Sequence, residues 1–598
     1  MDEQNKNLLL ATSLSFLVLL GWMLLFPPEP IDPESLETTT EQAAEEQSNT
    51  GLSTPVQVEK KESTEVSSVT ENIPRVPIET ARLSGSLSLK GGRIDNLKLL
   101  DYFETQDENS KNIELFQKDE NDYYAVYGWS GKNQVDVPNP NTVWNLVKGK
   151  KLSVDSPITL QWKNSNGIIF EREIKIDDNF LFTVKQRVFN KSNQNIEISP
   201  YGILARHGDP ETIGFYILHE GIVALDDEEL IELSYDDLTE QTYNERERAN
   251  LGLYDIVENG WIGFTDKYWM STLVGSPKSK FKMASKYNEA SDIYQADIRH
   301  PLEKLKPGDT TEIETYLFAG AKEVNTIKKY QKELGFSDFI DTVDWGWFFF
   351  LTKPIFSLLD YCNNFVGNMG WAIILLTLVI KTALLPLAYK SYVSMSKLKK
   401  LQPEMEKIKA KAGDDRMKLQ QEMMALYKKE KVNPAAGCLP ILLQIPIFFS
   451  LYKVLFVTIE VRHAPFFGWI TDLAAPDPSS ILNLFGLLPF TPPGPESFLA
   501  IFSIGVYPIL MGITMWLQQK LNPAPTDKTQ QMIFAWMPWI FMFLLGQFSS
   551  GLVIYWVANN IITFTQQYFI MTSQGVKPDI FGNILSSFKK KEGTSKEN

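Results

Sequence analysis

Cysteine and histidine are scarce in this chain, which has two cysteines and four histidines among 598 residues. Two cysteines exclude the multiple-disulfide framework of a small secreted domain. The chain also has no nucleotide-binding motif and no metal-ligand cluster, so we expect neither a cofactor nor a metal. Positive charge is in deficit as well: the net charge of −15 and the isoelectric point near 5.0 argue against direct binding to DNA.

Candidate catalytic residues are equally few. His207, His219 and His300 fall in one half of the chain, and we interpret them as ordinary surface or loop residues. Carboxylates are abundant, but no pair has a spacing that indicates a general acid and base. Ser549 and Ser550 precede a glycine, but a serine nucleophile needs a base, and no later segment contains a histidine. The sequence therefore predicts no covalent catalytic site.

The mean hydropathy of −0.16 is an average over the whole chain and does not show that the chain contains long apolar segments. Residues 8–26 are uninterruptedly apolar, and at about 1.5 Å per helical residue they can cross a hydrocarbon core of about 30 Å. "PPEP" follows instead of a cleavage signal, so residues 1–26 are interpreted as a retained signal-anchor helix. Residues 27–75 are rich in Glu, Thr, Ser, Pro and Gln, which predicts a disordered tether.

Period-two patterns dominate residues 76–321. "FEREIKI" (170–176) alternates apolar and charged residues, and Asn166-Gly167 lies between two such runs as a strong hairpin signal. Many short strands without intervening helices predict an antiparallel β-sandwich. Residues 322–337 have one apolar face and predict a helix that packs this domain toward a membrane. We therefore interpret 76–340 as one all-β domain with a C-terminal helix.

The second half of the chain has the composition of a membrane protein. Residues 344–362 are dense in aromatic side chains, which is typical of an amphipathic helix in the membrane interface. Five further apolar segments within 369–571 predict a five-helix core, and with the first span they give six transmembrane helices. The five segments are 369–389, 435–457, 498–518, 531–547 and 550–571.

Lysine and arginine set the orientation of these helices. Residues 390–432 contain twelve of them, whereas residues 458–497 contain only Arg462. The first of these loops is therefore predicted to be cytoplasmic. Counting along the chain places both termini and the basic tail 572–598 in the cytoplasm, and the β domain in the periplasm of a bacterium with two membranes.

The cytoplasmic loop is predicted to contain a helical hairpin at 392–432. Two charged helical patterns break at Gly413, and Asp414-Asp415 is placed to cap the second helix. The hairpin is either a solvated element or a partner-binding surface rich in adaptable methionine. Those methionines are Met405, Met417, Met423 and Met424. Cys362 and Cys438 fall toward opposite membrane faces on this topology and should not pair.

Polar residues inside the spans indicate the functional region. A cation at the bilayer centre costs roughly 2.5 kcal/mol or more, yet Lys381 lies within "LVIKTALLPL". Either its stem reaches the headgroups, or it belongs to a polar site. Thr377 lies one turn earlier, Gln444 lies mid-span in "LPILLQIPIF", and the last span has a polar stripe. The stripe consists of Trp556, Asn560, Thr563 and Gln567. Three helices that each offer polar side chains imply one shared wet concavity.

Three long motifs resemble the YidC-type membrane protein insertases of Gram-negative bacteria. They are "GDDRMKLQQEMMALYKKEKVNPAAGCLPILLQIPIFFSLYKVL" (413–455), "EVRHAPFFGWITDLAAPDP" (460–478) and "FSSGLVIYWVANNIITFTQQ" (548–567). The resemblance covers most of 344–571, and the first span, the tether and the β domain fit the same type.

The resemblance implies a fold and a set of site residues. The expected fold is a polytopic α-helical membrane protein with a large periplasmic all-β supersandwich domain, similar to sugar-mutarotase folds. The five-helix core is expected to hold a hydrophilic groove that is open to the cytoplasm and to lipid. In the family an arginine usually occupies the position of Lys381, so here the cation is kept and the bidentate fork is lost. Tyr555 and Trp556 match a tyrosine pair that contacts substrate, with the second position altered.

The implied function is insertion, folding and assembly of inner-membrane proteins, alone or with the Sec translocon. The expected partners are nascent membrane proteins, the lipid bilayer, and ribosomes or targeting factors that contact the hairpin and the basic tail. Two alternatives stay open at this point. One is a transporter or channel that uses the same polar groove, and the other is a membrane-anchored periplasmic sugar-active enzyme.

Overall fold

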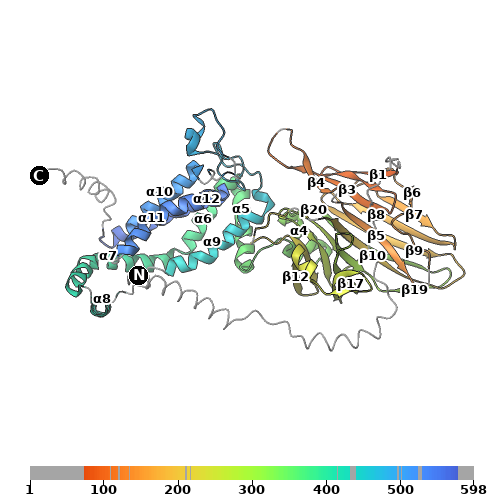
Figure 1. Cartoon of the computed structure of the whole chain (residues 1–598), viewed down its shortest axis with the longest axis horizontal. Coiled ribbons are helices and arrows are strands. Elements are labelled where there is room, and N and C mark those ends of the chain that lie inside the picture. Colours follow the sequence, from red (N-terminus) through yellow and green to blue (C-terminus); the bar gives the residue numbers. More distant parts are fainter. Residues whose placement is uncertain are drawn as a thin grey trace.

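The computed structural model describes residues 73–576, with gaps inside that range. The gaps are 108, 119–121, 133–134, 209, 211, 216, 414, 431, 433–438, 494–496, 498, 500–501 and 523–527. The predicted signal-anchor helix, nearly all of the tether, most of the basic tail, Asp414 and Cys438 therefore lie outside the described residues. The described chain forms a β-sheet domain and a helical region that lie end to end (Figure 1).

The first sheet has eleven strands in the described residues, in the order β1-β2-β3-β5-β10-β18-β17-β14-β13, with β4 on β3 and β19 on β10. The strands are β1 (Arg75–Glu79), β2 (Leu83–Ser88), β3 (Arg93–Phe103), β4 (Asn112–Phe116), β5 (Tyr123–Gly131), β10 (Ile196–His207), β13 (Tyr243–Asn244), β14 (Ala249–Ile256), β17 (Phe281–Asn288), β18 (Ile293–Arg299) and β19 (Glu303–Leu305).

The second sheet has nine described strands in the order β12-β11-β15-β16-β20-β9-β8-β7-β6. The strands are β6 (Asn145–Lys148), β7 (Ile158–Lys163), β8 (Ile168–Ile176), β9 (Leu181–Asn190), β11 (Gly221–Asp226), β12 (Glu229–Ser234), β15 (Gly260–Thr265), β16 (Trp269–Val274) and β20 (Thr310–Ala321). A short helix, α3 (Tyr235–Glu240), follows β12.

Side-chain alternation explains how the two sheets pack into a sandwich. In β8 every second residue from Ile168 is buried, and Asn166-Gly167 forms the predicted turn between β7 and β8, with Gly167 at φ 90°. Arg172 of β8 is fully buried. Its guanidinium donates to two carbonyls of the other sheet region, that of Gly92 just before β3 and that of Tyr127 in β5. The hairpin prediction is thus confirmed, and a buried cation joins the two layers.

Nine α-helices follow the last strand in the described residues. The first, α4 (Val324–Leu334), still belongs to the β domain, and the other eight are α5 (Phe349–Val366), α6 (Met369–Ala383), α7 (Leu385–Ala412), α8 (Arg416–Lys429), α9 (Leu439–Val457), α10 (Val506–Leu521), α11 (Lys528–Leu544) and α12 (Ser550–Ser573). Among the described residues no single helix is both long and apolar enough to cross a membrane, while α6 and α7, bent by 69° from each other, pass by length and composition as a pair.

Three predicted helix bounds are wrong. The interfacial helix begins at Phe349 rather than at residue 344, because Gly346 turns the chain at φ 68°. The segment 369–389 is not one straight helix, because it breaks after Ala383. Within the segment 498–518 the α-helix α10 begins at Val506, since the preceding Gly505 is extended at φ −78° and ψ 174°.

One histidine differs in part from the prediction. His300 follows β18, but it is only 4% exposed, and its ring packs against Phe281 with 5.5 Å between the ring centroids. Burial lowers the pKa of His300 to about 4. Neither ring nitrogen has a hydrogen-bond partner among the described residues. His300 therefore lies in a loop, which the prediction of a surface or loop residue allows, but it is not at the surface, and the neutral imidazole is part of the domain interior.

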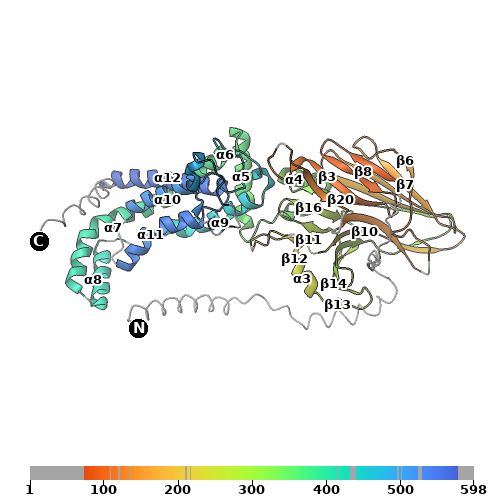
Figure 2. The same cartoon turned by 45° about the horizontal axis from the view of Figure 1, so that its top comes forward.

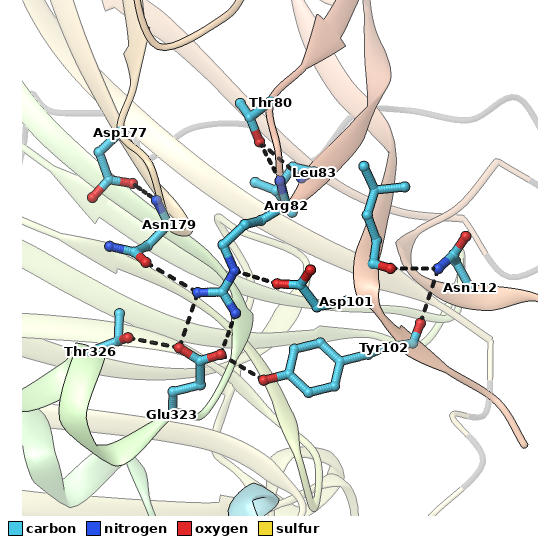
Figure 3. Close-up of polar contacts among 11 residues, drawn as sticks. Thr80, Arg82, Leu83, Asp101, Tyr102, Asn112, Asp177, Asn179, Glu323 and Thr326 are labelled. Atoms are coloured by element: carbon cyan, nitrogen blue, oxygen red, sulfur yellow. Dashed lines mark hydrogen bonds and ion pairs between the residues drawn. The ribbon is translucent and has the colours of Figure 1, made fainter. Parts of the chain in front are cut away.

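A polar network fixes helix α4 to the β domain. Figure 3 shows Arg82 directed at Glu323, the residue that precedes α4, and at Asp101 at the end of β3. The Tyr102 hydroxyl donates to the same Glu323 carboxylate at 2.6 Å, and Thr326 donates at 2.7 Å. Burial by itself would raise the pKa of Glu323, but these hydrogen bonds outweigh it and lower that pKa below its usual value.

A second set of contacts joins the β domain to the helical region. Glu460, just beyond α9, accepts a hydrogen bond from the backbone N–H of Val324 at 3.0 Å and so caps α4 from the other region. Burial raises the pKa of Glu460 to about 7. The Lys453 ammonium of α9 lies 2.6 Å from Asp344, and Arg462 donates to carbonyls at the end of β3. The two regions thus share buried polar contacts.

Candidate functional site

Helix α6 places Lys381 in its last turn, next to a sharp bend. The helix begins at Asn368, whose side chain accepts from a backbone N–H of the first turn. The hydroxyls of Thr377 and Thr382 each donate to the carbonyl four residues earlier, an arrangement that favours helix bending. Pro386 then stands at the start of α7. Lys381 is therefore about 18 Å along the helix from Met369, at the end that leads into the α7–α8 hairpin.

The Lys381 ammonium is directed at a neighbouring helix rather than at a counter-ion. Its Nζ donates to Oε1 of Gln444 in α9 at 3.1 Å, and the side chain is half-buried. No carboxylate of the described residues forms an ion pair with it. Gln566 of α12 also donates to the Lys381 carbonyl at 3.4 Å. The ammonium is thus held between α6 and α9 without an ion-pair partner among the described residues, while α12 contacts the Lys381 backbone.

Further amides extend this contact to a fourth helix. The Nε2 of Gln444 donates to Oδ1 of Asn559 at 3.0 Å, and Asn559 lies beside Asn560 in α12. The Nδ2 of Asn560 donates to the Thr514 hydroxyl of α10 at 3.2 Å. Asn559 and Asn560 are each 3% exposed. We call Lys381, Gln444, Asn559, Asn560 and Thr514 the polar cluster.

Two of the predicted site residues stand apart from the polar cluster. Thr377 is buried, but its hydroxyl is used within its own helix. Thr563 is 4% exposed, one turn beyond Asn560, and its hydroxyl has no partner among the described residues. The structure therefore brings Lys381, Gln444 and Asn560 together, and it leaves Thr377 and Thr563 next to them without a shared hydrogen bond.

The predicted aromatic contacts lie one turn from the polar cluster, in α12. Tyr555 is 3% exposed, whereas Trp556 is half-buried. Both pack against Phe448 of α9, with 6.4 Å between the centroids of Phe448 and Tyr555 and 4.5 Å between those of Phe448 and Trp556. An apolar aromatic wall thus borders the polar cluster, as separate polar and apolar surfaces of the same two helices.

Asn559 and Thr514 were missed from the sequence. The predicted polar stripe on the last span contains residues three or four positions apart, which lie on one helix face. This pattern includes Asn560 and leaves out the adjacent Asn559. Two adjacent asparagines in an otherwise apolar helix were the available signal, because one of them must face a second partner helix. Thr514 gives no such signal, since a threonine in an apolar helix can bond to its own backbone.

Comparison with known proteins identifies the family. A family model described as 60Kd inner membrane protein matches residues 361–577, and one described as YidC periplasmic domain matches residues 75–358. The Membrane protein insertase YidC of Dinoroseobacter shibae is 57% identical over 602 residues, with 99% of each chain covered. The insertase of Roseobacter denitrificans is 58% identical, with 99% of each chain covered. That of Ruegeria pomeroyi is 53% identical, with 100% of each chain covered. The chain therefore belongs to the YidC family of membrane protein insertases, with an inner-membrane part and a periplasmic β-sandwich domain.

Proposed function

We propose that this chain inserts membrane proteins by receiving the hydrophilic part of a client at Lys381 and Gln444, two partly exposed members of the polar cluster, while the apolar part passes into lipid. The observation that carries the proposal is the Lys381–Gln444 contact, which keeps an ammonium without an ion-pair partner among the described residues between α6 and α9. A hydrophilic segment in hydrocarbon would lose its hydration at a cost of several kcal/mol per polar group. Amides, hydroxyls and one cation replace part of that hydration.

Lys381 has the chemistry to hold acidic residues of the client. An ammonium offers three N–H donors, and Gln444 takes one of them. Two donors are then left for a client carboxylate, and a hydrogen bond between charged groups is roughly twice as strong as a neutral one. The contact is brief because an ammonium, unlike a guanidinium, does not bind a carboxylate through two parallel hydrogen bonds in a fixed geometry.

The apolar part of the client gains free energy by leaving the chain. The partly exposed Trp556 offers a surface along which this segment slides, and the buried Tyr555 supports the same aromatic wall beside α9. Transfer of its side chains from water into lipid is favourable by about 25 cal/mol per Å². The membrane potential adds about 2.3 kcal/mol per charge and 100 mV. These two terms drive insertion without nucleotide hydrolysis.

The ends of the molecule suit different partners. In Figures 1 and 2 the α7–α8 hairpin lies at the end of the helical region farthest from the β domain. We assign that end to the cytoplasm, where Met417, Met424 and the lysines of α8 are available to ribosomes or targeting factors. The Sec translocon is a further proposed partner. At the end of the helical region nearer the β domain (Figure 1), Trp347 just before α5 and Phe365 in its last turn are 94% and 77% exposed and suit the lipid interface.

The test compares two single-span clients that differ only in the translocated segment, one with acidic residues and one with the matching amides. Purified full-length protein in liposomes is expected to insert the acidic client better. Lys381→Glu abolishes this preference because it replaces attraction by repulsion, whereas Lys381→Arg keeps it. Protease protection of the translocated segment measures insertion. Equal insertion of both clients by the unchanged protein and by Lys381→Glu refutes the proposed role of Lys381.

The two alternatives receive no specific support. The relatives that match over the full length are insertases, which speaks neither for a transporter nor for a sugar-active enzyme.

A further inference from the structure

The hydrogen bonds of the polar cluster all run in one direction. Lys381 donates to Gln444, and the Gln444 amide donates to Asn559 at 3.0 Å. The Nδ2 of Asn559 faces Oδ1 of Asn560 at 3.5 Å, and Asn560 donates to Thr514 at 3.2 Å. Each side chain therefore accepts from the previous member and donates to the next one.

The two ends of this chain explain its direction. The first member, Lys381, is an ammonium and can only donate. The last contact is the Thr514 hydroxyl donating to the backbone carbonyl of Met511 at 3.0 Å, and a carbonyl can only accept. If the Gln444 amide were rotated by 180°, its N–H groups would face the Lys381 ammonium and its oxygen would face the Asn559 oxygen, so both hydrogen bonds would be lost. The orientation of every amide between the two ends is thus determined by the ends.

Asn559 has the decisive place in this chain. It is buried in α12, and its Oδ1 is the acceptor that holds the Gln444 amide with its Nε2 away from Lys381. Without that acceptor the Gln444 amide is free to rotate, so its Oε1 is no longer held toward the ammonium. Lys381 then loses its one side-chain partner among the described residues, and its long flexible stem can leave the bundle interior for the headgroups.

We propose that Asn559 is a positioning residue that keeps Lys381 in place for acidic clients, and that Asn560 and Thr514 fix Asn559 in turn. The proposal rests on the proposed role of Lys381 and deepens it: selectivity for acidic translocated segments depends on a residue that does not touch the client. Because the effect acts through the cation alone, insertion of a neutral client does not depend on this chain of amides.

The experiment uses the same pair of acidic and neutral clients with full-length protein in liposomes. Asn559→Leu is expected to lower the ratio of acidic to neutral insertion by about tenfold, the factor for one hydrogen bond to a charged group, with neutral insertion kept. Thr514→Val, which is nearly isosteric, is expected to lower the ratio by a smaller factor. The control is Gln567→Leu, which breaks a separate hydrogen bond at 2.9 Å from the buried Gln567 amide of α12 to the exposed Asn522 and is expected to keep the ratio.

The outcomes separate the two proposals. If Lys381→Gln removes the preference while Asn559→Leu and Thr514→Val both keep it, the positioning role is refuted and the role of Lys381 stands. If Lys381→Gln also keeps the preference, both proposals are refuted. Equal loss of acidic and neutral insertion in Asn559→Leu, with an unchanged ratio in Thr514→Val, identifies a merely structural role and also refutes the inference.

Discussion

At the scale of single residues, this chain buries some charged groups in close ion pairs and leaves others with few partners among the described residues. In the β domain, Lys286 of β17 is 1% exposed and lies 2.8 Å from Asp297 and 3.3 Å from Glu247. Glu460 accepts a backbone N–H through one carboxylate oxygen, its other oxygen has no partner among the described residues, and burial raises the pKa of this carboxyl. A buried ion pair adds little net stability, but removal of one partner leaves the other charge stranded.

Lys286→Met is therefore expected to destabilise the protein by about 3 kcal/mol or more, because two buried carboxylates lose their cation. The apparent melting temperature of the full-length protein in detergent measures this effect. Lys282 on the same strand pairs with Asp255 at 2.8 Å, but both side chains are about half exposed or more. Lys282→Met is the matched control and should cost less than about 1 kcal/mol. Equal losses in both variants would contradict the prediction.

Glu460 predicts a dependence of stability on pH. Its pKa in the folded protein is about 7, above the ordinary value of 4.5, so the folded state binds the proton more tightly than the unfolded state. The stability that Glu460 contributes is full below pH 4.5 and is lost as the pH rises through 7. Relative to the unchanged protein, Glu460→Gln should therefore be more stable at pH 8.5 than at pH 5.5, by about 2 kcal/mol.

Melting curves at the two pH values test this difference. Glu333→Gln, at an exposed position of α4, controls for the change in net charge. A Glu460→Gln effect of the same size at both pH values would show that the carboxyl does not titrate in this range.

At the scale of elements, helix ends determine how the helical region is divided. Gly413 ends α7 at φ 56°, a backbone conformation that favours glycine, and Asp415 begins α8 by accepting from the backbone N–H of Lys418 at 3.0 Å. The predicted break at Gly413 and the predicted cap at Asp415 are confirmed. The bend after Ala383 has a similar local origin in threonine back-bonding and Pro386.

Asp415→Ala should therefore loosen the first turn of α8 by about 1 kcal/mol. Amide hydrogen exchange across residues 416–420 is expected to become about fivefold faster, while exchange in α7 stays unchanged. Asp415→Asn keeps a side-chain acceptor and should behave like the original residue. Unchanged exchange in Asp415→Ala would mean that tertiary packing, not the cap, holds this turn.

At the scale of the whole molecule, the β domain is held on the helical region by contacts far apart in sequence. Arg462 reaches the carbonyls of Phe103 and Glu104, and the Gln106 amide donates to the Thr471 carbonyl at 2.8 Å. Together with Lys453 and Glu460, these contacts set the direction in which the sandwich projects from the helices (Figure 2).

A pair of introduced cysteines, Gln106→Cys and Thr471→Cys, is expected to be linked efficiently by a short bifunctional thiol reagent, after Cys362 and Cys438 are replaced. Both positions are exposed, so the reagent can reach them. Arg462→Ala should lower the yield, because it removes the neighbouring contact between the two regions. A single-cysteine protein controls for links between molecules, and a yield equal to that background would contradict the described arrangement.

Much of the fold was predictable from local pattern. Alternation in β8, the Asn166-Gly167 turn and the cap at Asp415 each depend on residues close in sequence, and each is confirmed. The strand order, in which β10 lies between β5 and β18, was not predictable, because pairing of distant strands leaves no period in the sequence. The burial of His300 was missed for the same reason, since it depends on which strands enclose the loop.

The amino-acid sequence by itself determined the apolar and polar segments, the turns, the caps and the presence of an isolated lysine in an apolar run, because each depends on neighbouring residues. The family follows from the same residues through their match to known insertases. Only the tertiary structure decided that Lys381 meets Gln444, and that Asn559 and Thr514 continue the chain of hydrogen bonds. Four helices supply these side chains, and the contacts between the helices join residues 46 to 185 positions apart in sequence, where no local pattern reaches.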